Sequence, residues 1–263
     1  EELVMSLMTF IGNSDSILDE VPGYARLVKL RHPILANEDL YRIRNLNLDD
    51  FRCHTIATGF PLPADGSALQ EALDDLCKRA EHAVEHGNRI IVLSDRDLPV
   101  DVVPIPMLLA VSSVNKHLAR KGLRTRTGII AETGEAREVM HLALLLGYGA
   151  SAVNPYLAFE AVADMAARNR LERPVSVVMA VENYIRSLCK GLLKIMSRMG
   201  ISTLRSYRNA QVFEAIGLSR EVVSRYFEGT ASRIEGIGLD EIAAEATARY
   251  RSAGGQQGAA GAV

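Results

Sequence analysis

The sequence predicts an α/β protein made of parallel βα units that form an incomplete, TIM-barrel-like sheet with additional flanking helices. From about residue 51, short runs rich in β-branched residues alternate with longer segments whose apolar residues follow the helical period. Four such units follow one another, and the first turn is not glycine-rich, which favours a half-barrel over an open doubly wound sheet. With 263 residues, 48% of them hydrophobic, the chain can bury a sizeable core.

Each unit joins a predicted strand to the helix that follows it. The first helix places Leu69, Leu73 and Leu76 on one face, and glycines at Gly87 and Gly147 end the first and third helices. The four predicted pairs are Cys53–Thr58 with Leu69–His86, Ile90–Leu93 with Ile105–Lys121, Thr125–Ala131 with Glu135–Leu146, and Ala150–Val153 with Tyr156–Arg168.

The flanking segments have a different character. Residues 1–50 are predicted to be an irregular and helical entry segment, in which Arg31-His32-Pro33 ends one stretch and Asn37 caps a short helix that runs through Ile43. After Arg173-Pro174 the predicted elements are helices at Val177–Met199, Ala210–Ile216, Arg220–Phe227 and Asp240–Arg251, with a strand at Ile201–Ser206. We therefore expect one domain over 1–172, a helical connection over 173–252 and a flexible Gly/Ala/Gln tail over 253–263.

Charge and cysteine content exclude several classes of protein. Thirty basic and thirty-two acidic residues are interspersed, so neither nucleic acid nor a membrane surface is an expected partner. The cysteines Cys53, Cys77 and Cys189 lack disulfide or metal spacing, which favours a reducing, cytoplasmic location. The chain does not begin with Met, and we expect it to be a piece of a longer protein.

One short motif has the spacing of a metal site. His82, Glu85 and His86 match the H-x-x-E-H pattern of inverted zinc peptidases. The helix is predicted to stop directly afterwards, and no third ligand can be identified downstream. The simpler interpretation is a polar last turn, where a histidine is stabilised by the helix dipole, and we predict no metal site.

Two predicted strands end in charged loops, the place where α/β proteins usually carry functional groups. Asp95 and Arg96 follow the second strand, while Glu132 and Glu135 flank the end of the third. They could serve an anion-binding or acid–base site, or they could be a turn ion pair and a helix start. No complete catalytic set emerges from the residues alone.

Five long strings carry a family resemblance. They are similar to stretches of glutamate synthase large subunits, in the same order and at similar spacing. The strings are LVMSLMTFIG (3–12), HGNRIIVLSDRDL (86–98), GLRTRTGIIAETGEAREVMHLALLLGYGASAVNPYLAFEA (122–161), GLLKIMSRMGISTLRSYRNAQVFEAIGLS (191–219) and SRIEGIGLDEI (232–242). Departures are small: Arg198 and Asn209 stand where the family usually has Lys and Gly.

The resemblance implies a non-catalytic central domain plus the lead-in to an FMN-binding synthase domain. The parent enzyme is an oxidoreductase of ammonia assimilation that converts glutamine and 2-oxoglutarate to two glutamates. Its FMN and 3Fe-4S cluster are expected outside this chain, and its electrons come from a small NADPH-oxidising subunit or from ferredoxin. The expected partners here are the amidotransferase and synthase domains of the same chain.

The resemblance also implies site residues. An ammonia tunnel joins the two reaction centres of the family, and the motif at its entrance corresponds to Thr9, with Ser6 beside it. The strand-end residues Asp95, Arg96, Glu132 and Glu135 are then candidates for domain docking. The alternative is a stand-alone barrel-type enzyme or binding module that uses those loops. Apolar segments at 192–199 and 212–216 are expected to be exposed and to favour a homodimer.

Overall fold

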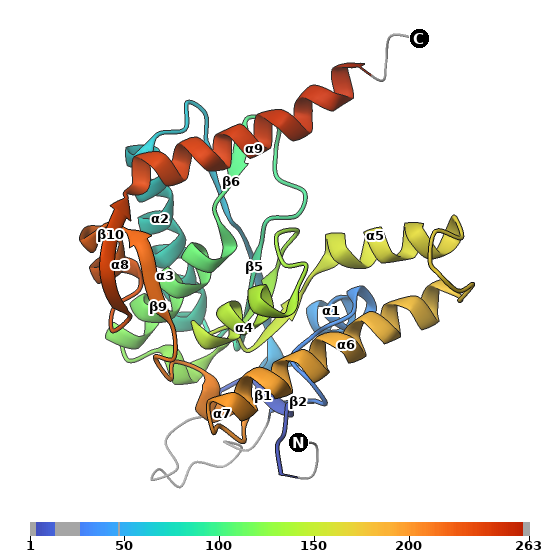
Figure 1. The fold of residues 1–263 in the computed structure, drawn as a ribbon. Coiled ribbons are helices and arrows are strands. Elements are labelled where there is room, and N and C mark those ends of the chain that lie inside the picture. The colour runs from blue at the N-terminus through green and yellow to red at the C-terminus, as the bar shows by residue number, and fades with distance from the viewer. Residues whose placement is uncertain (1–3, 14–26, 47, 260–263) are drawn as a thin grey trace, which may run out of the picture.

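A four-stranded parallel sheet forms the centre of the fold. The computed structural model describes residues 4–13, 27–46 and 48–259, with side chains as far as residue 253. The strands are β3 (Cys53–Ala57), β5 (Ile90–Ser94), β7 (Gly128–Glu132) and β8 (Ala152–Asn154), in that order across the sheet (Figure 1). Every residue of β5 and β7 is buried, as expected for a parallel sheet covered on both faces.

Three helices cover one face of this sheet. They are α2 (Gly66–Glu85), α3 (Met107–Arg120) and α4 (Val139–Gly147), and their apolar sides share one core with the sheet. The side chain of Asp65 caps α2 by accepting from the backbone N–H of Ala68 at 2.8 Å. The fourth unit ends in α5 (Tyr156–Ala167). The predicted α/β class with parallel βα units is therefore confirmed.

The N-terminal segment before β3 covers the opposite face of the sheet. A short antiparallel pair, β1 (Thr9–Ile11) and β2 (Val28–Leu30), is followed by α1 (Asn37–Arg44). Residues before α1 also pair with the β8 edge, where the N–H of Leu35 donates to the carbonyl of Val153 at 2.9 Å. A second apolar cluster joins Ile11, Leu35, Leu40 and Ile43 to Ile90, Val92, Ile130 and Ala152 of the sheet. The four-stranded sheet does not close into a barrel in the described residues, and this segment covers the face opposite to α2, α3 and α4.

The C-terminal flank differs from its prediction in two places. Its elements are α6 (Val177–Arg198), α7 (Leu204–Tyr207), β9 (Glu214–Leu218), α8 (Arg220–Tyr226), β10 (Ala231–Ile237) and α9 (Leu239–Ala259). The strand predicted at 201–206 is wrong, since those residues lead into α7. The helix predicted at 210–216 is also wrong, because β9 begins at Glu214 and pairs in parallel with β10 across α8.

Smaller differences concern boundaries and short elements. A second antiparallel pair, β4 (Gly59–Pro61) and β6 (Val102–Pro104), and the 3-10 turns η1 (Asp49–Phe51) and η2 (Arg124–Arg126) were not predicted. The turn η2 delays the third strand to Gly128, and the following helix starts at Val139. Asn37 is the first residue of α1, and Ala36 occupies the cap position. Helix α9 covers most of the segment expected to be a flexible tail.

The flanking helices share the main core with the βα units. Leu192 and Met196 of α6 are 1% and 0% exposed, so this part of the apolar surface that suggested a homodimer is covered within the chain, whereas Ile216 in the second apolar segment is 68% exposed. The dimer and the domain boundary near 172 both stay predictions.

In Figure 1, α5 and α6 run side by side away from the sheet, and α9 crosses α2 at the other side. None of the described helices is long and apolar enough to cross a bilayer.

Candidate functional site

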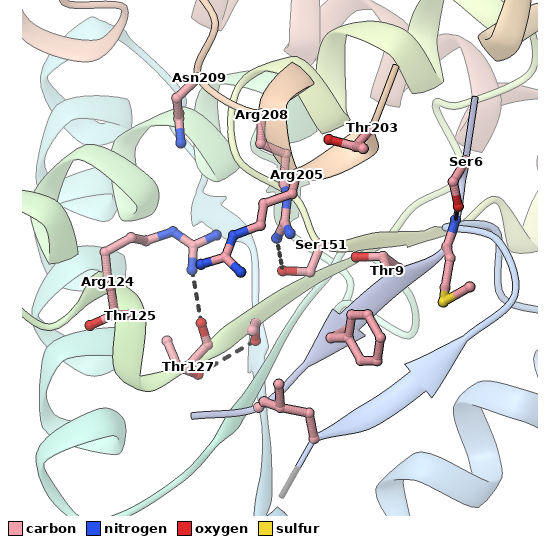
Figure 2. A pocket seen from close by; sticks show the side chains of 15 residues that line it. Ser6, Thr9, Arg124, Thr125, Thr127, Ser151, Thr203, Arg205, Arg208 and Asn209 are labelled. Atoms are coloured by element: carbon pink, nitrogen blue, oxygen red, sulfur yellow. Dashed lines mark hydrogen bonds between the residues drawn. The ribbon is translucent and has the colours of Figure 1, made fainter. Parts of the chain in front are cut away.

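A pocket of about 520 Å³ lies at the amino ends of β7 and β8. Gly128 is the first residue of β7, and Ser151 directly precedes β8. The N-terminal strand β1 and the α7 region supply the other walls (Figure 2). The described lining residues are Ser6, Met8, Thr9, Phe10, Gly12, Leu27, Arg124, Thr125, Thr127, Gly128, Ser151, Thr203, Arg205, Arg208 and Asn209.

Both residues proposed from the resemblance line this pocket. Thr9 pairs with Leu30 across the β1–β2 ladder, and it is 2% exposed. Its hydroxyl oxygen has no hydrogen-bond partner among the described residues. Ser6 is partly exposed, and its Oγ accepts from the backbone N–H of Met8 at 3.1 Å. Ser6 also forms a parallel bridge with Thr203, which fixes the N-terminal segment against the start of α7.

Three arginines that the sequence analysis did not single out converge on the same space (Figure 2). Arg124 donates only to neutral acceptors: Oδ1 of Asn115 at 2.5 Å, and the backbone carbonyls of Thr127 at 2.8 Å and Gly149 at 2.6 Å. Burial, together with the nearby charge of Arg208, lowers the pKa of Arg124 to about 10. The guanidinium therefore remains charged near neutral pH, without a carboxylate among these partners.

Arg208 and Arg205 belong to the segment that includes α7. Arg208 donates to the hydroxyl of Ser151 at 3.1 Å, whereas its buried Nε has no partner among the described residues. Burial and the charge of Arg205 lower the pKa of Arg208. Asn209, at φ 59°, turns the chain here and accepts from Asn115 at 2.8 Å. Glycine adopts this backbone conformation freely and asparagine tolerates it, which accounts for the departure from the family at this position.

The described lining combines cationic and hydroxyl groups and contains neither aspartate nor glutamate. Such a surface can donate hydrogen bonds to a neutral or anionic guest, and it repels cations. The pocket lies at the end of the sheet opposite to the one that usually carries catalytic groups in barrel folds. Nothing in this set is a nucleophile with an adjacent base.

The strand-end residues come together at the carboxyl edge of the sheet. Glu132, 2% exposed, accepts two hydrogen bonds from the guanidinium of Arg44, at 3.1 and 2.5 Å. The hydroxyl of Ser94 donates to the same carboxylate at 2.5 Å. These contacts attach α1 to the ends of β5 and β7. They leave Glu132 engaged inside the chain.

Asp95, Arg96 and Glu135 also have internal partners. Asp95 accepts from the hydroxyl of Thr133 at 2.5 Å and the N–H of Gly134 at 3.0 Å, and burial raises its pKa to about 6 despite these bonds. Arg96 pairs with Glu160 at 2.9 Å. Glu135 accepts from the N–H of Met107 at 2.8 Å. A docking role for these residues stays a prediction.

The remaining sequence candidates do not form metal or cluster sites in the described residues. His82 lies in the last turn of α2 and His86 is its C-cap residue, with Nδ1 of His86 2.8 Å from the carbonyl oxygen of His82. Cys53, Cys77 and Cys189 lie on three different elements, and burial raises their pKa values to about 11, 12 and 11. The three thiols therefore do not form the closely spaced cysteine set of an iron–sulfur cluster.

Comparison with known proteins identifies the relatives of this chain. Residues 1–219 match the glutamate synthase central domain, past the position where we expected that domain to end. The chain is 44% identical to the glutamate synthase (NADPH) large chain of Bacillus subtilis (strain 168), covering 96% of this chain and 16% of that one. It is 38% identical to glutamate synthase (NADH) of Schizosaccharomyces pombe, covering 95% of this chain and 12% of that one. It is 39% identical to ferredoxin-dependent glutamate synthase of Pyropia yezoensis, covering 93% of this chain and 16% of that one.

The chain thus spans less than a fifth of the length of these relatives, at 12 to 16%. Among solved structures, a mutant flavocytochrome b2 with benzoylformate is similar at 18% identity and a TM-score of 0.42, over 51% of this chain and 31% of that one. A likeness at this level says nothing about function. The sequence relationship is decisive, and the chain belongs to the glutamate synthase large-chain family, of which it contains the central domain.

Proposed function

We propose that this chain is a non-catalytic scaffold that carries part of an ammonia conduit between the two reaction centres of a glutamate synthase. The observation that carries the proposal is the pocket at Thr9, because both tunnel candidates suggested by the family, Thr9 and Ser6, line it. In the parent protein, glutamine and 2-oxoglutarate would be converted to two glutamates in the cytoplasm, at sites supplied by the flanking regions.

The chemistry of the lining supports passage of neutral ammonia. Arg124, Arg205 and Arg208 give the pocket a positive electrostatic potential, which disfavours an ammonium cation there. They would therefore lower the pKa of ammonium and favour its neutral form, NH3. The hydroxyl of Thr9 can both donate and accept one hydrogen bond, which matches a small molecule with a lone pair and N–H groups. No carboxylate of the described lining is present to hold ammonium in place.

The scaffold role rests on how the chain is built. One core connects the βα units with α6, α7, α8 and α9, and a second core joins β1 to β7, which supports a fixed relation between the pocket walls from β1, β7 and α7. The carboxyl-edge groups Glu132 and Asp95 are buried and hydrogen-bonded internally, which favours a structural role over acid–base catalysis. FMN, the 3Fe-4S cluster and the electron donor, whether a small NADPH-oxidising subunit or ferredoxin, would be bound by other parts of the protein.

The test uses a protein that carries this chain together with the regions that flank it in its relatives. Thr9→Val removes the unpartnered hydroxyl while keeping the side-chain shape. We expect glutamine hydrolysis to continue. We also expect a fall in the amount of glutamate made from 2-oxoglutarate for each glutamine hydrolysed, because the released ammonia escapes. The measurement is the ratio of the two products under saturating reductant.

A matched control exists within the chain. Thr58 is also buried and also has an unpartnered hydroxyl, but it lies after β3, away from the pocket. Thr58→Val should leave the product ratio unchanged. An unchanged ratio in Thr9→Val, with normal hydrolysis, would contradict a role for Thr9 in the conduit.

A further inference from the structure

We propose that the pocket beside Thr9 also binds a small oxoanion, held by Arg205, Arg208 and Arg124. The inference goes beyond the conduit proposal, since anion binding can be measured without any ammonia transfer. It rests on three independent features of the pocket: its charge, its unused hydrogen-bond donors and its size.

The charge of the pocket is not balanced within the described residues. Three guanidinium groups line it, and no aspartate or glutamate does. Arginine side chains elsewhere in the described structure commonly pair with carboxylates, for example Arg44 with Glu132 and Arg225 with Asp74. Gathering three like charges without a partner costs electrostatic free energy, and a bound anion would remove that cost.

Unused donors point to a ligand as well. Nε of Arg208 and Oγ1 of Thr9 are buried and have no partner in the described residues. Buried polar groups in folded proteins are nearly always hydrogen-bonded, so such atoms need an explanation. Nε of Arg208 can only donate, and the hydroxyl of Thr9 can rotate to donate, which suits an acceptor-only guest.

The guest must also match the geometry of a guanidinium. A planar guanidinium presents paired N–H groups that fit two oxygens of a carboxylate or phosphate. The volume of about 520 Å³ accommodates an ion of that size with bound water. Arg205 is exposed and has no ion pair in the described part of the chain, so it can turn toward such an ion from the solvent side.

Inorganic phosphate is the probe, titrated into the 263-residue chain by calorimetry at constant ionic strength, with chloride as the comparison anion. We expect one saturable site for phosphate and none for chloride. Arg205→Gln and Arg208→Gln should each weaken binding at least about tenfold, the usual effect of losing one charged hydrogen-bond partner. Raising the salt concentration should weaken it further.

Arg173→Gln is the matched control, because Arg173 is an exposed arginine in the connection between α5 and α6. It should bind phosphate as the unsubstituted chain does. Arg205 makes no contact that the fold needs in the described residues, so its variant should fold, which circular dichroism checks. Absence of saturable phosphate binding at low salt, or equal binding by both pocket variants and the unsubstituted chain, would overturn the proposal. Neither result would bear on the product ratio of the Thr9 variant.

Discussion

Replacing Arg44 by methionine would leave the Glu132 carboxylate buried without its cation. The substitution keeps the length and much of the apolar stem of the side chain while removing the charge. Two hydrogen bonds to Glu132 are lost, at 3.1 and 2.5 Å, and only the Ser94 hydroxyl still donates to it. The end of β7 and helix α1 would lose their polar connection.

The size of the effect follows from the burial of the pair. Glu132 is 2% exposed and the side chain of Arg44 is 31% exposed, so solvent screens the pair only from one side. Breaking a buried pair by removing one partner costs about 3–5 kcal/mol, and the partial exposure places this case near 3 kcal/mol. For a chain of this length, that loss lowers the melting temperature by about 5 °C.

Urea unfolding followed by circular dichroism measures the loss, and two variants test its cause. Arg42→Met on the same helix removes an exposed i,i+3 contact to Asp39 at 3.7 Å and should cost under about 0.5 kcal/mol. Adding Glu132→Gln to Arg44→Met should recover part of the loss, because the buried charge is gone. If Arg44→Met were no more harmful than Arg42→Met, the buried pair would not stabilise the fold as argued.

Two further predictions concern pH and packing. Burial raises the pKa of Asp95 to about 6, so the folded chain holds that proton more tightly than the unfolded chain does. The free energy of unfolding should therefore fall by up to about 3 kcal/mol as the pH rises from about 4 to 6, and Asp95→Asn should flatten this part of a urea-unfolding pH series. In α6, a Cβ on Gly191 would lie 2.4 Å from Cγ2 of Val139. Gly191→Ala should cost about 1–3 kcal/mol in urea unfolding, and adding Val139→Ala should restore stability; a neutral Gly191→Ala would contradict this close packing.

The sheet could be predicted because its signal is local. Ile90–Ser94 and Gly128–Glu132 are short apolar runs between turns, and the helix α2 shows its buried stripe in the spacing of its leucines. The segment around β9 could not be predicted in the same way. This strand pairs with β10 across α8, but its residues are exposed or half-buried and lack the continuous apolar run that marks β5 and β7.

The site was predictable only in part, for a related reason. Thr9 and Ser6 came from the family resemblance, whereas Arg124 and Arg208 were missed because they are far apart in the sequence and meet only in the fold. Reading 201–206 as a strand also concealed the turn that carries Arg205. The available signal in the sequence was the spacing of Arg205 and Arg208 just before Asn209, but this spacing indicates no site without the strand ends that lie opposite it in the fold.

The origin of the ammonia nitrogen tests the central claim most directly. A protein with this chain and its flanking regions would be supplied with unlabelled glutamine, 2-oxoglutarate, reductant and an excess of 15N-ammonium in solution. If the Thr9 pocket is part of an enclosed conduit, the new glutamate should carry nitrogen from glutamine, and Thr9→Val should admit the 15N label. Full exchange with the labelled ammonium in the unsubstituted protein would contradict a conduit through this domain.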